Sequence, residues 1–155
     1  ELSPATVVVV DQRAAALDQA RHLGAHATVT PGPDAAAEIL DLSRGRGVDV
    51  CIDLVGVDDT LALGASVTRS LGHLTLVGLG GGTLPVGFFS PAYEVSVAST
   101  YWGTLPELVE VLELAESGRI HADVHRVSLA DAATAYRSLH DGSVTGRVVV
   151  VPSQP

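Results

Sequence analysis

Short runs of β-branched and aliphatic residues alternate along the first half of the chain with segments rich in Ala and Leu. In the first of these Ala-rich segments, Ala16, Ala20 and Leu23 fall on one side of a helix. Short apolar runs between helical segments are typical of strands that are buried on both faces of a parallel sheet. The pattern therefore predicts strands at 6–10, 27–29, 48–55 and 73–77, separated by helices at 14–23, 35–42 and 58–68.

The second half is less regular. A further strand is expected at 95–100, a helix from Pro106 to Ser117, an extended segment at 121–128, a helix at 130–140 and a last strand at 147–151. Strands and helices that alternate through short loops favour parallel pairing. The expected fold class is therefore α/β, with a doubly wound parallel sheet.

The amino-acid composition excludes several classes of function. The 155 residues, 46% of them hydrophobic, are enough for one domain with a core. The net charge of −9, without a basic cluster, argues against nucleic acid as a partner. The complete absence of Lys excludes Schiff-base chemistry. A single Cys suits a reducing compartment, so a cytoplasmic location is expected. The uncharged stretch 74–93 contains five Gly and two Pro, which favours strand and loop over a membrane helix.

The strongest local cue is Asp11, which directly follows the run Val7–Val10. In dinucleotide-binding units a carboxylate at the end of a strand accepts hydrogen bonds from the adenosine ribose, and it repels the 2′-phosphate of NADP. The alternative interpretation is that Asp11 only caps the helix that follows. Arg13 leaves the choice of cofactor open, because a guanidinium two residues later could meet a 2′-phosphate.

A phosphate-binding G-x-G-x-x-G motif is expected about 20 residues before that acid. Only ten residues precede Asp11, and none of them is Gly. The one glycine cluster, Gly78–Gly82, does not keep the motif's spacing, because Thr83 stands where the last Gly belongs. Pro85 follows it instead of a helix, so this cluster is not interpreted as a phosphate loop.

Other candidate chemistry is weak. His121 and His125, with Asp123 between them, form a possible ligand set, but residues four apart on an extended segment lie about 13 Å apart. Cys51 lies within an apolar run and is interpreted as core. No catalytic residue and no metal ligand is therefore predicted in this chain.

Taken together, several segments carry a resemblance to a known family. The chain resembles the C-terminal NAD-binding part of medium-chain, zinc-dependent alcohol dehydrogenases, most closely the bacterial NAD-dependent secondary-alcohol type. The resemblance rests on the order and spacing of Val10-Asp11, Leu23-Gly24-Ala25, 47–56, 72–79, 101–104 and 142–150. It implies a Rossmann-like sheet that lacks its first strand and glycine-rich loop. It also implies an incomplete dinucleotide-binding domain over 1–120 and, over 121–155, a tail that packs back on the catalytic domain.

The resemblance implies roles for individual residues. Asp11, with Arg13 nearby, would bind the adenosine ribose, and Arg147 the pyrophosphate. The residues that would border the ribose or the nicotinamide are Leu54, Val55, Gly56, Val77, Gly78, Leu79, Thr100 and Trp102. A Lys that the family often carries in the helix after the acid is replaced by Ala14–Ala16. The implied cofactor is NAD, with zinc only in a catalytic domain outside this chain.

The implied function is the NAD(H)-binding portion of an enzyme that interconverts secondary alcohols and ketones, with a small-molecule alcohol or ketone as substrate and a homo-oligomeric state. One alternative is a non-catalytic binding or assembly module derived from a dehydrogenase. Another is a fragment of a zinc-free reductase of the same superfamily. Loss of the first, central strand would leave two strands without a neighbour. We therefore expect a rearranged or oligomer-completed sheet first, completion within a larger assembly second, and a persisting gap last.

Overall fold

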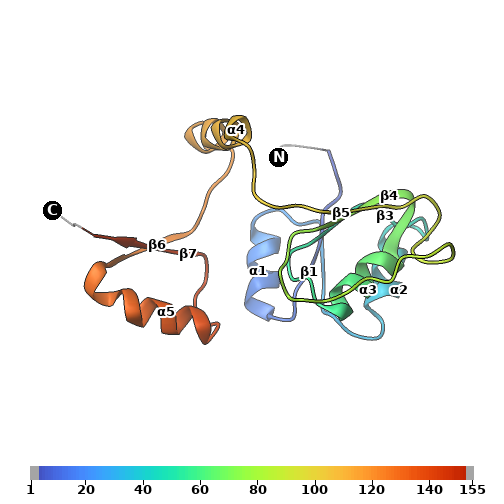
Figure 1. Cartoon of the computed structure of the whole chain (residues 1–155), viewed down its shortest axis with the longest axis horizontal. Coiled ribbons are helices and arrows are strands. Elements are labelled where there is room, and N and C mark those ends of the chain that lie inside the picture. The colour runs from blue at the N-terminus through green and yellow to red at the C-terminus, as the bar shows by residue number, and fades with distance from the viewer. Residues whose placement is uncertain (1–3, 153–155) are drawn as a thin grey trace. The chain divides into compact units, whose positions relative to one another are not determined.

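A computed structural model of the chain describes residues 4–152. The chain divides into two compact units, one ending at Trp102 and the other beginning at Gly103 (Figure 1). Residues 1–3 and 153–155 of the two predicted domains lie outside the described residues. The domain boundary expected at 120/121 was defined by the packing of residues 121–155 on a catalytic domain. That boundary stays a prediction.

The first unit alternates strands and helices as the sequence pattern predicts. Its elements are β1 (Val8–Val10), α1 (Ala14–His22), β2 (Ala27–Val29), α2 (Ala35–Leu42), β3 (Val48–Asp53), α3 (Asp58–Val67), β4 (Thr68–Leu76) and β5 (Ser96–Ser99). The main difference is at β4, which begins five residues before the expected strand at 73–77. The chain passes from α3 directly into an extended Thr68, and the polar residues Arg69 and Ser70 gave no apolar signal for a strand.

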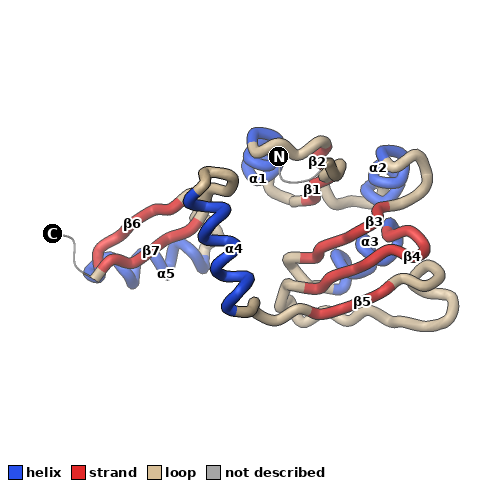
Figure 2. The backbone as a smooth tube through the Cα atoms, turned by 90° about the horizontal axis from the view of Figure 1, so that it is seen from above, coloured by secondary structure: helices blue, strands red, loops and turns tan. Residues whose placement is uncertain are grey.

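All pairings between named strands are parallel, which confirms the expected α/β class. In the first unit β1 pairs with β2, and β3 pairs with β4, which in turn pairs with β5 (Figure 2). Among the described residues β1 and β3 are not hydrogen-bonded to each other, so these strands belong to two separate sheets. Within the described residues no other strand fills the gap, so it persists, which is the outcome ranked last. Completion of the sheet by another copy or within a larger assembly stays a prediction.

A shared core joins the two sheets. The buried side chains Val29, Ala35, Ile39 and Val67 come from β2, α2 and α3, and Val48 of β3 packs against them. The packing of α2 on α3 thus connects the two sheets in place of strand pairing. On β3 the side chains of Val50 and Ile52 are exposed, although the apolar pattern of this strand is typical of a buried strand.

The second unit contains α4 (Leu105–Glu116), β6 (Val124–Ser128), the 3₁₀ turn η1 (Leu129–Asp131), α5 (Ala132–His140) and β7 (Arg147–Val151). The helix α4 begins with a capping box, in which Thr104 Oγ1 accepts from the Glu107 N–H and Glu107 accepts from the Thr104 N–H. The strands β6 and β7 pair in parallel beside α5. In the described part of the chain, none of the helices combines the length and apolar character needed to cross a membrane.

Candidate functional site

The ends of four strands define the candidate site. Asp11 directly follows β1, Leu54 follows β3, Val77 follows β4 and Thr100 follows β5. Because the strands within each sheet run parallel, β3, β4 and β5 have their carboxyl ends on one edge. Ligands of open α/β sheets bind outside this edge.

At the end of β1 the Asp11 carboxylate turns back on the start of α1. Its Oδ1 accepts a hydrogen bond from the Arg13 N–H at 2.8 Å and lies 3.3 Å from Arg13 Nε. Burial alone would raise the pKa of Asp11, but the hydrogen bonds and charge of Arg13 outweigh it and hold the pKa below its ordinary value. With 28% of its side chain exposed, the carboxylate is ionised and still reachable by a ligand hydroxyl.

The turn after β3 is built around Asp53, which is 6% exposed. Its Oδ1 accepts from the N–H groups of Val55 (2.8 Å) and Gly56 (2.9 Å), and its Oδ2 accepts from the Thr60 hydroxyl at 2.8 Å. The turn needs Gly56 because its φ is +75°, in the left-handed region. Leu54 is left 72% exposed on the outside of this turn.

The glycine cluster after β4 packs on that same turn, backbone against backbone. The Gly80 N–H donates to the Val55 carbonyl at 2.9 Å, and the Gly82 N–H donates to the Gly56 carbonyl at 2.8 Å. A Cβ on Gly78 would stand 2.1 Å from the Val55 carbonyl carbon. The glycines are therefore required for close packing on the β3–α3 turn, which agrees with the interpretation that they are not a phosphate loop.

The first turn of α3 is closed in the same way. The Thr83 N–H donates to the Asp58 carboxylate at 2.7 Å, so the loop after the glycines is tied to the N-terminus of the helix. Asp58 and Asp59 both lie in that first turn. Two carboxylates there already meet the positive end of the helix dipole, so this terminus is unsuited to a phosphate.

Exposed apolar side chains line the edge beside these turns. Leu79 is 89% exposed and Trp102 is 83% exposed, with Trp102 in an edge-to-face contact with Tyr101 at 5.6 Å between ring centroids. The Thr100 N–H donates to the Leu76 carbonyl at 2.9 Å, which continues the β4–β5 pairing by one residue. Ten of the eleven predicted site residues thus lie in the first unit, at or just beyond strand ends.

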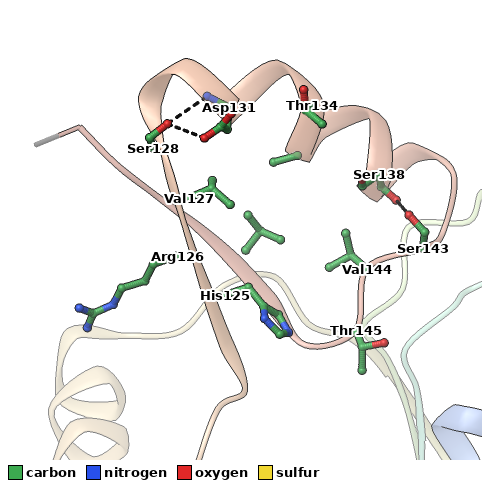
Figure 3. Close-up of a pocket in the computed structure, with 12 residues that line it drawn as sticks. His125, Arg126, Val127, Ser128, Asp131, Thr134, Ser138, Ser143, Val144 and Thr145 are labelled. Atoms are coloured by element: carbon green, nitrogen blue, oxygen red, sulfur yellow. Dashed lines mark hydrogen bonds between the residues drawn. The ribbon is translucent and has the colours of Figure 1, made fainter. Parts of the chain in front are cut away.

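The eleventh, Arg147, begins β7 in the second unit, where it is exposed and its N–H donates to the Asp123 carbonyl at 2.7 Å. That unit also holds a hollow of about 730 Å³ below α5. Figure 3 shows Val127 and Val144 toward α5 and Arg126 pointing away from it. Ser128 and Asp131 bond to each other there, and the Ser143 hydroxyl donates to the Ser138 carbonyl. None of the predicted site residues lines this hollow.

The geometry of the described residues favours neither a metal site nor a reactive cysteine. Within residues 4–152, no three His, Cys, Asp or Glu side chains are grouped to hold a metal ion. Cys51 lies against α3, where a Cβ on Gly64 would stand 3.0 Å from its sulfur. Burial, and then the charge of Asp53, raises the pKa of this thiol above 9.0, so it is a poor nucleophile at neutral pH.

The sequence analysis placed Asp53 on a strand but assigned it no role, and it missed Thr60. The signal for Asp53 was the one used for Asp11, an acid that directly follows a run of apolar residues. What the sequence could not indicate is that this acid turns inward and binds its own turn, whereas Asp11 stays partly exposed.

A sequence model of the family described as zinc-binding dehydrogenase matches residues 2–117. The chain is 32% identical over 148 residues to a D-arabinose 1-dehydrogenase (NADP(+)) of Saccharolobus solfataricus, covering 95% of the chain and 42% of that protein. It is 35% identical over 147 residues to an NAD-dependent alcohol dehydrogenase of Sulfolobus acidocaldarius, covering 93% and 42%.

Among solved structures, the chain is similar to the alcohol dehydrogenase of the hyperthermophilic archaeon Aeropyrum pernix. The TM-score is 0.86 at 32% sequence identity, over 97% of this chain and 44% of that one. The chain thus spans less than half the length of the curated relatives and of this structure. The part that it matches is the C-terminal part of the relatives.

Proposed function

The chain belongs to the zinc-binding dehydrogenase family, and from that membership we propose that it is the NAD(H)-binding portion of an alcohol dehydrogenase. The observation that carries the proposal is the joint edge formed by the turns after β3 and β4. These turns are locked together through Asp53 and the glycines, and they leave Leu54 and Leu79 exposed beside them. A flat, partly apolar nicotinamide ring suits a rigid edge of this kind.

The residues fit the two ends of NAD. Asp11 offers a partly exposed, ionised carboxylate for the adenosine ribose hydroxyls. The turns 54–56 and 77–79, with Thr100 and Trp102, would border the nicotinamide, and Arg147 would reach the pyrophosphate by its guanidinium fork. Helix α1 begins at Ala14 and offers no Lys for a second ribose contact. Bound NAD supplies the carrier that accepts or gives up a hydride.

In the intact protein the activity proposed is hydride transfer between a secondary alcohol and NAD, with the corresponding ketone as product. The alcohol oxygen would be polarised by zinc held outside this chain. Assembly of identical copies is proposed as well, because among the described residues β5 pairs on one edge only and all four of its residues are exposed. The single Cys supports a reducing, cytoplasmic setting.

The rival proposal is a module that keeps the dehydrogenase fold without binding the cofactor. It is favoured by one observation, which is that the glycines after β4 are used in packing on the β3–α3 turn and do not form a phosphate loop. Much of the pyrophosphate affinity of such domains comes from the backbone N–H groups at the helix that this loop precedes. The two proposals therefore differ in whether the protein binds NADH at all.

Titration of the purified protein with NADH, followed by nicotinamide fluorescence, tests this difference. Saturable binding below the millimolar range, with competition by ADP-ribose, is the result expected of a cofactor domain. Should NADH and ADP-ribose both fail to bind at millimolar concentration, the NAD-binding proposal is overturned and the non-catalytic module is favoured. NADPH in the same titration compares the two cofactors.

A further inference from the structure

We propose that Asp53 is a positioning residue for the nicotinamide end of the cofactor, an inference that rests on the proposed NAD-binding function. Among the described residues, no hydrogen bond joins Asp53 to Asp11 or Arg13, the two residues predicted for the adenosine side. It acts through the two turns that would carry the nicotinamide, 54–56 and 77–79, because it is bonded to both of them.

The side chain of Asp53 fixes the first turn. Three donors converge on its two oxygens, the N–H groups of Val55 and Gly56 and the hydroxyl of Thr60, at distances between 2.8 and 2.9 Å. Thr60 lies in the first turn of α3, so the carboxylate joins the end of β3 to the start of the helix. The path of the chain between them, with Leu54 on its outer side, is thereby held at both ends.

The backbone of Asp53 fixes the second turn. Its carbonyl accepts from the N–H groups of both Val77 (2.8 Å) and Gly78 (3.0 Å), the first residues beyond β4. The two turns then touch directly, since a Cβ on Gly56 would stand 2.4 Å from the Gly78 carbonyl oxygen. A shift of the first turn must therefore displace the second.

The burial of Asp53 argues for positioning more than for stability. A carboxylate that is 6% exposed loses most of its hydration, and its bonded partners in the described part of the chain are backbone N–H groups and one hydroxyl. Burying an ionised group against neutral donors costs free energy that an apolar side chain would not. What the carboxylate provides is two acceptor atoms in fixed places, which a shorter or apolar side chain cannot provide.

The test compares two ligands in the same protein. ADP-ribose contains the adenosine end of the cofactor and lacks the nicotinamide, whereas NADH contains both. We expect D53A to raise the dissociation constant of NADH by about tenfold or more, as a displaced contact can. The dissociation constant of ADP-ribose is expected to stay within about twofold of the wild-type value. A general loss of structure would weaken both ligands, so the difference between them identifies positioning.

The conservative variant D53N is expected to restore NADH binding to within a few-fold of wild type. The amide oxygen of the Asn can accept from the N–H groups of Val55 and Gly56, and its NH₂ can donate to Thr60 Oγ1. The Thr60 hydroxyl can then donate to the Val57 carbonyl, which lies 3.0 Å away in the wild-type protein. The matched control is D49N, which removes an exposed carboxylate from the same strand, and it should leave both ligands unchanged. If D53A does not fold, T60V removes the donor to Oδ2 together with the bonds between the Thr60 hydroxyl and the backbone of Val57, and it should weaken NADH alone.

The outcomes separate the two proposals. A wild-type protein that binds neither NADH nor ADP-ribose overturns NAD binding and, with it, the role of Asp53. A wild-type protein that binds both, together with folded D53A or T60V variants that keep the wild-type ratio of NADH to ADP-ribose affinity, overturns the role of Asp53 and leaves NAD binding intact.

Discussion

Gly56 and Gly78 are in backbone contact, so close that a Cβ on Gly56 would stand 2.4 Å from the Gly78 carbonyl oxygen. Two glycines that the sequence places in different loops, after β3 and after β4, are thus one structural feature. It holds together the turns that form the candidate nicotinamide edge, and it makes the first prediction possible.

The substitution G56A should lower the free energy of unfolding by about 3–4 kcal/mol, because it adds a steric clash to an unfavourable backbone conformation. The matched control is G81A in the loop that follows β4. Gly81 has a φ of +81°, close to the +75° of Gly56, but nothing lies within 4 Å of its Cβ position. G81A should therefore cost only about 1–2 kcal/mol. Urea denaturation measures both, and equal losses would contradict the proposed contact.

The thiol of Cys51 should be unreactive in the folded protein. Burial, and then the charge of Asp53, raises its pKa above the ordinary value of 9.0, so at pH 8 the folded protein holds little thiolate. We expect the reaction with a disulfide reagent such as DTNB to be about tenfold or more slower in the native protein than in urea at that pH. Because the chain has one Cys, C51A gives the reagent blank.

The sign of the accompanying pH effect follows from linkage. A raised folded pKa disfavours the folded state once the unfolded thiol ionises, so this contribution to stability is lost as the pH rises above about 9. For the DTNB reaction, equal rates in the native and the unfolded protein at pH 8 would show that α3 does not shield Cys51.

At the opposite end of β3, Asp49 should make stability sensitive to acid. Hydrogen bonds from Arg46 and then from Arg69 hold the pKa of Asp49 well below its ordinary value of 3.8. A lowered folded pKa stabilises the protein above about pH 4 and the effect is lost as the pH falls toward the folded pKa. The variant D49N should therefore have a lower Tm than wild type at pH 7, and the difference should narrow as the pH falls below about 4.

Thermal melts at several pH values between 7 and 2 test this prediction. The matched control is D18N on α1, where Asp18 pairs with Arg21 alone at an exposed i,i+3 position. A difference between wild type and D49N that stays constant over the whole pH range would mean that the two arginines do not act on the ionised carboxylate.

How far the sequence predicts this molecule depends on the range of the contacts. Elements such as Ala27–Val29, Ala35–Leu42 and Arg147–Val151 are found with the bounds that the pattern predicts, since periodicity and caps are local signals. The separate sheets of β1–β2 and β3–β5 correspond to the outcome ranked last, because the sequence pattern does not show that α2 packs on α3 and connects the two sheets. Likewise, an acid at a strand end can face outward as Asp11 does or inward as Asp53 does, and the apolar pattern before it is the same.

The adenosine side offers the last prediction, which separates the two interpretations of Asp11. If its carboxylate accepts from the ribose hydroxyls, D11N should weaken NADH by about tenfold, since a hydrogen bond to a charged group contributes about 1.5 kcal/mol or more. The same change removes repulsion from a 2′-phosphate and frees Arg13 from the 3.3 Å ion pair, so NADPH should bind as well as before or better. The ratio of NADPH to NADH affinity is therefore expected to rise.

Competition titrations with both cofactors measure this ratio, with D18N as the control that removes a carboxylate from α1 but not from the strand end. The double variant D11N/R13A should lose the gain in NADPH affinity, because the guanidinium that would meet the phosphate is gone. If D11N lowers the Tm but leaves the ratio at the wild-type value, the Oδ1 bond to the Arg13 N–H is the whole role of Asp11. In that case the carboxylate only fixes the turn that leads into α1, whose N-cap is Arg13, and any preference for NAD must come from other residues.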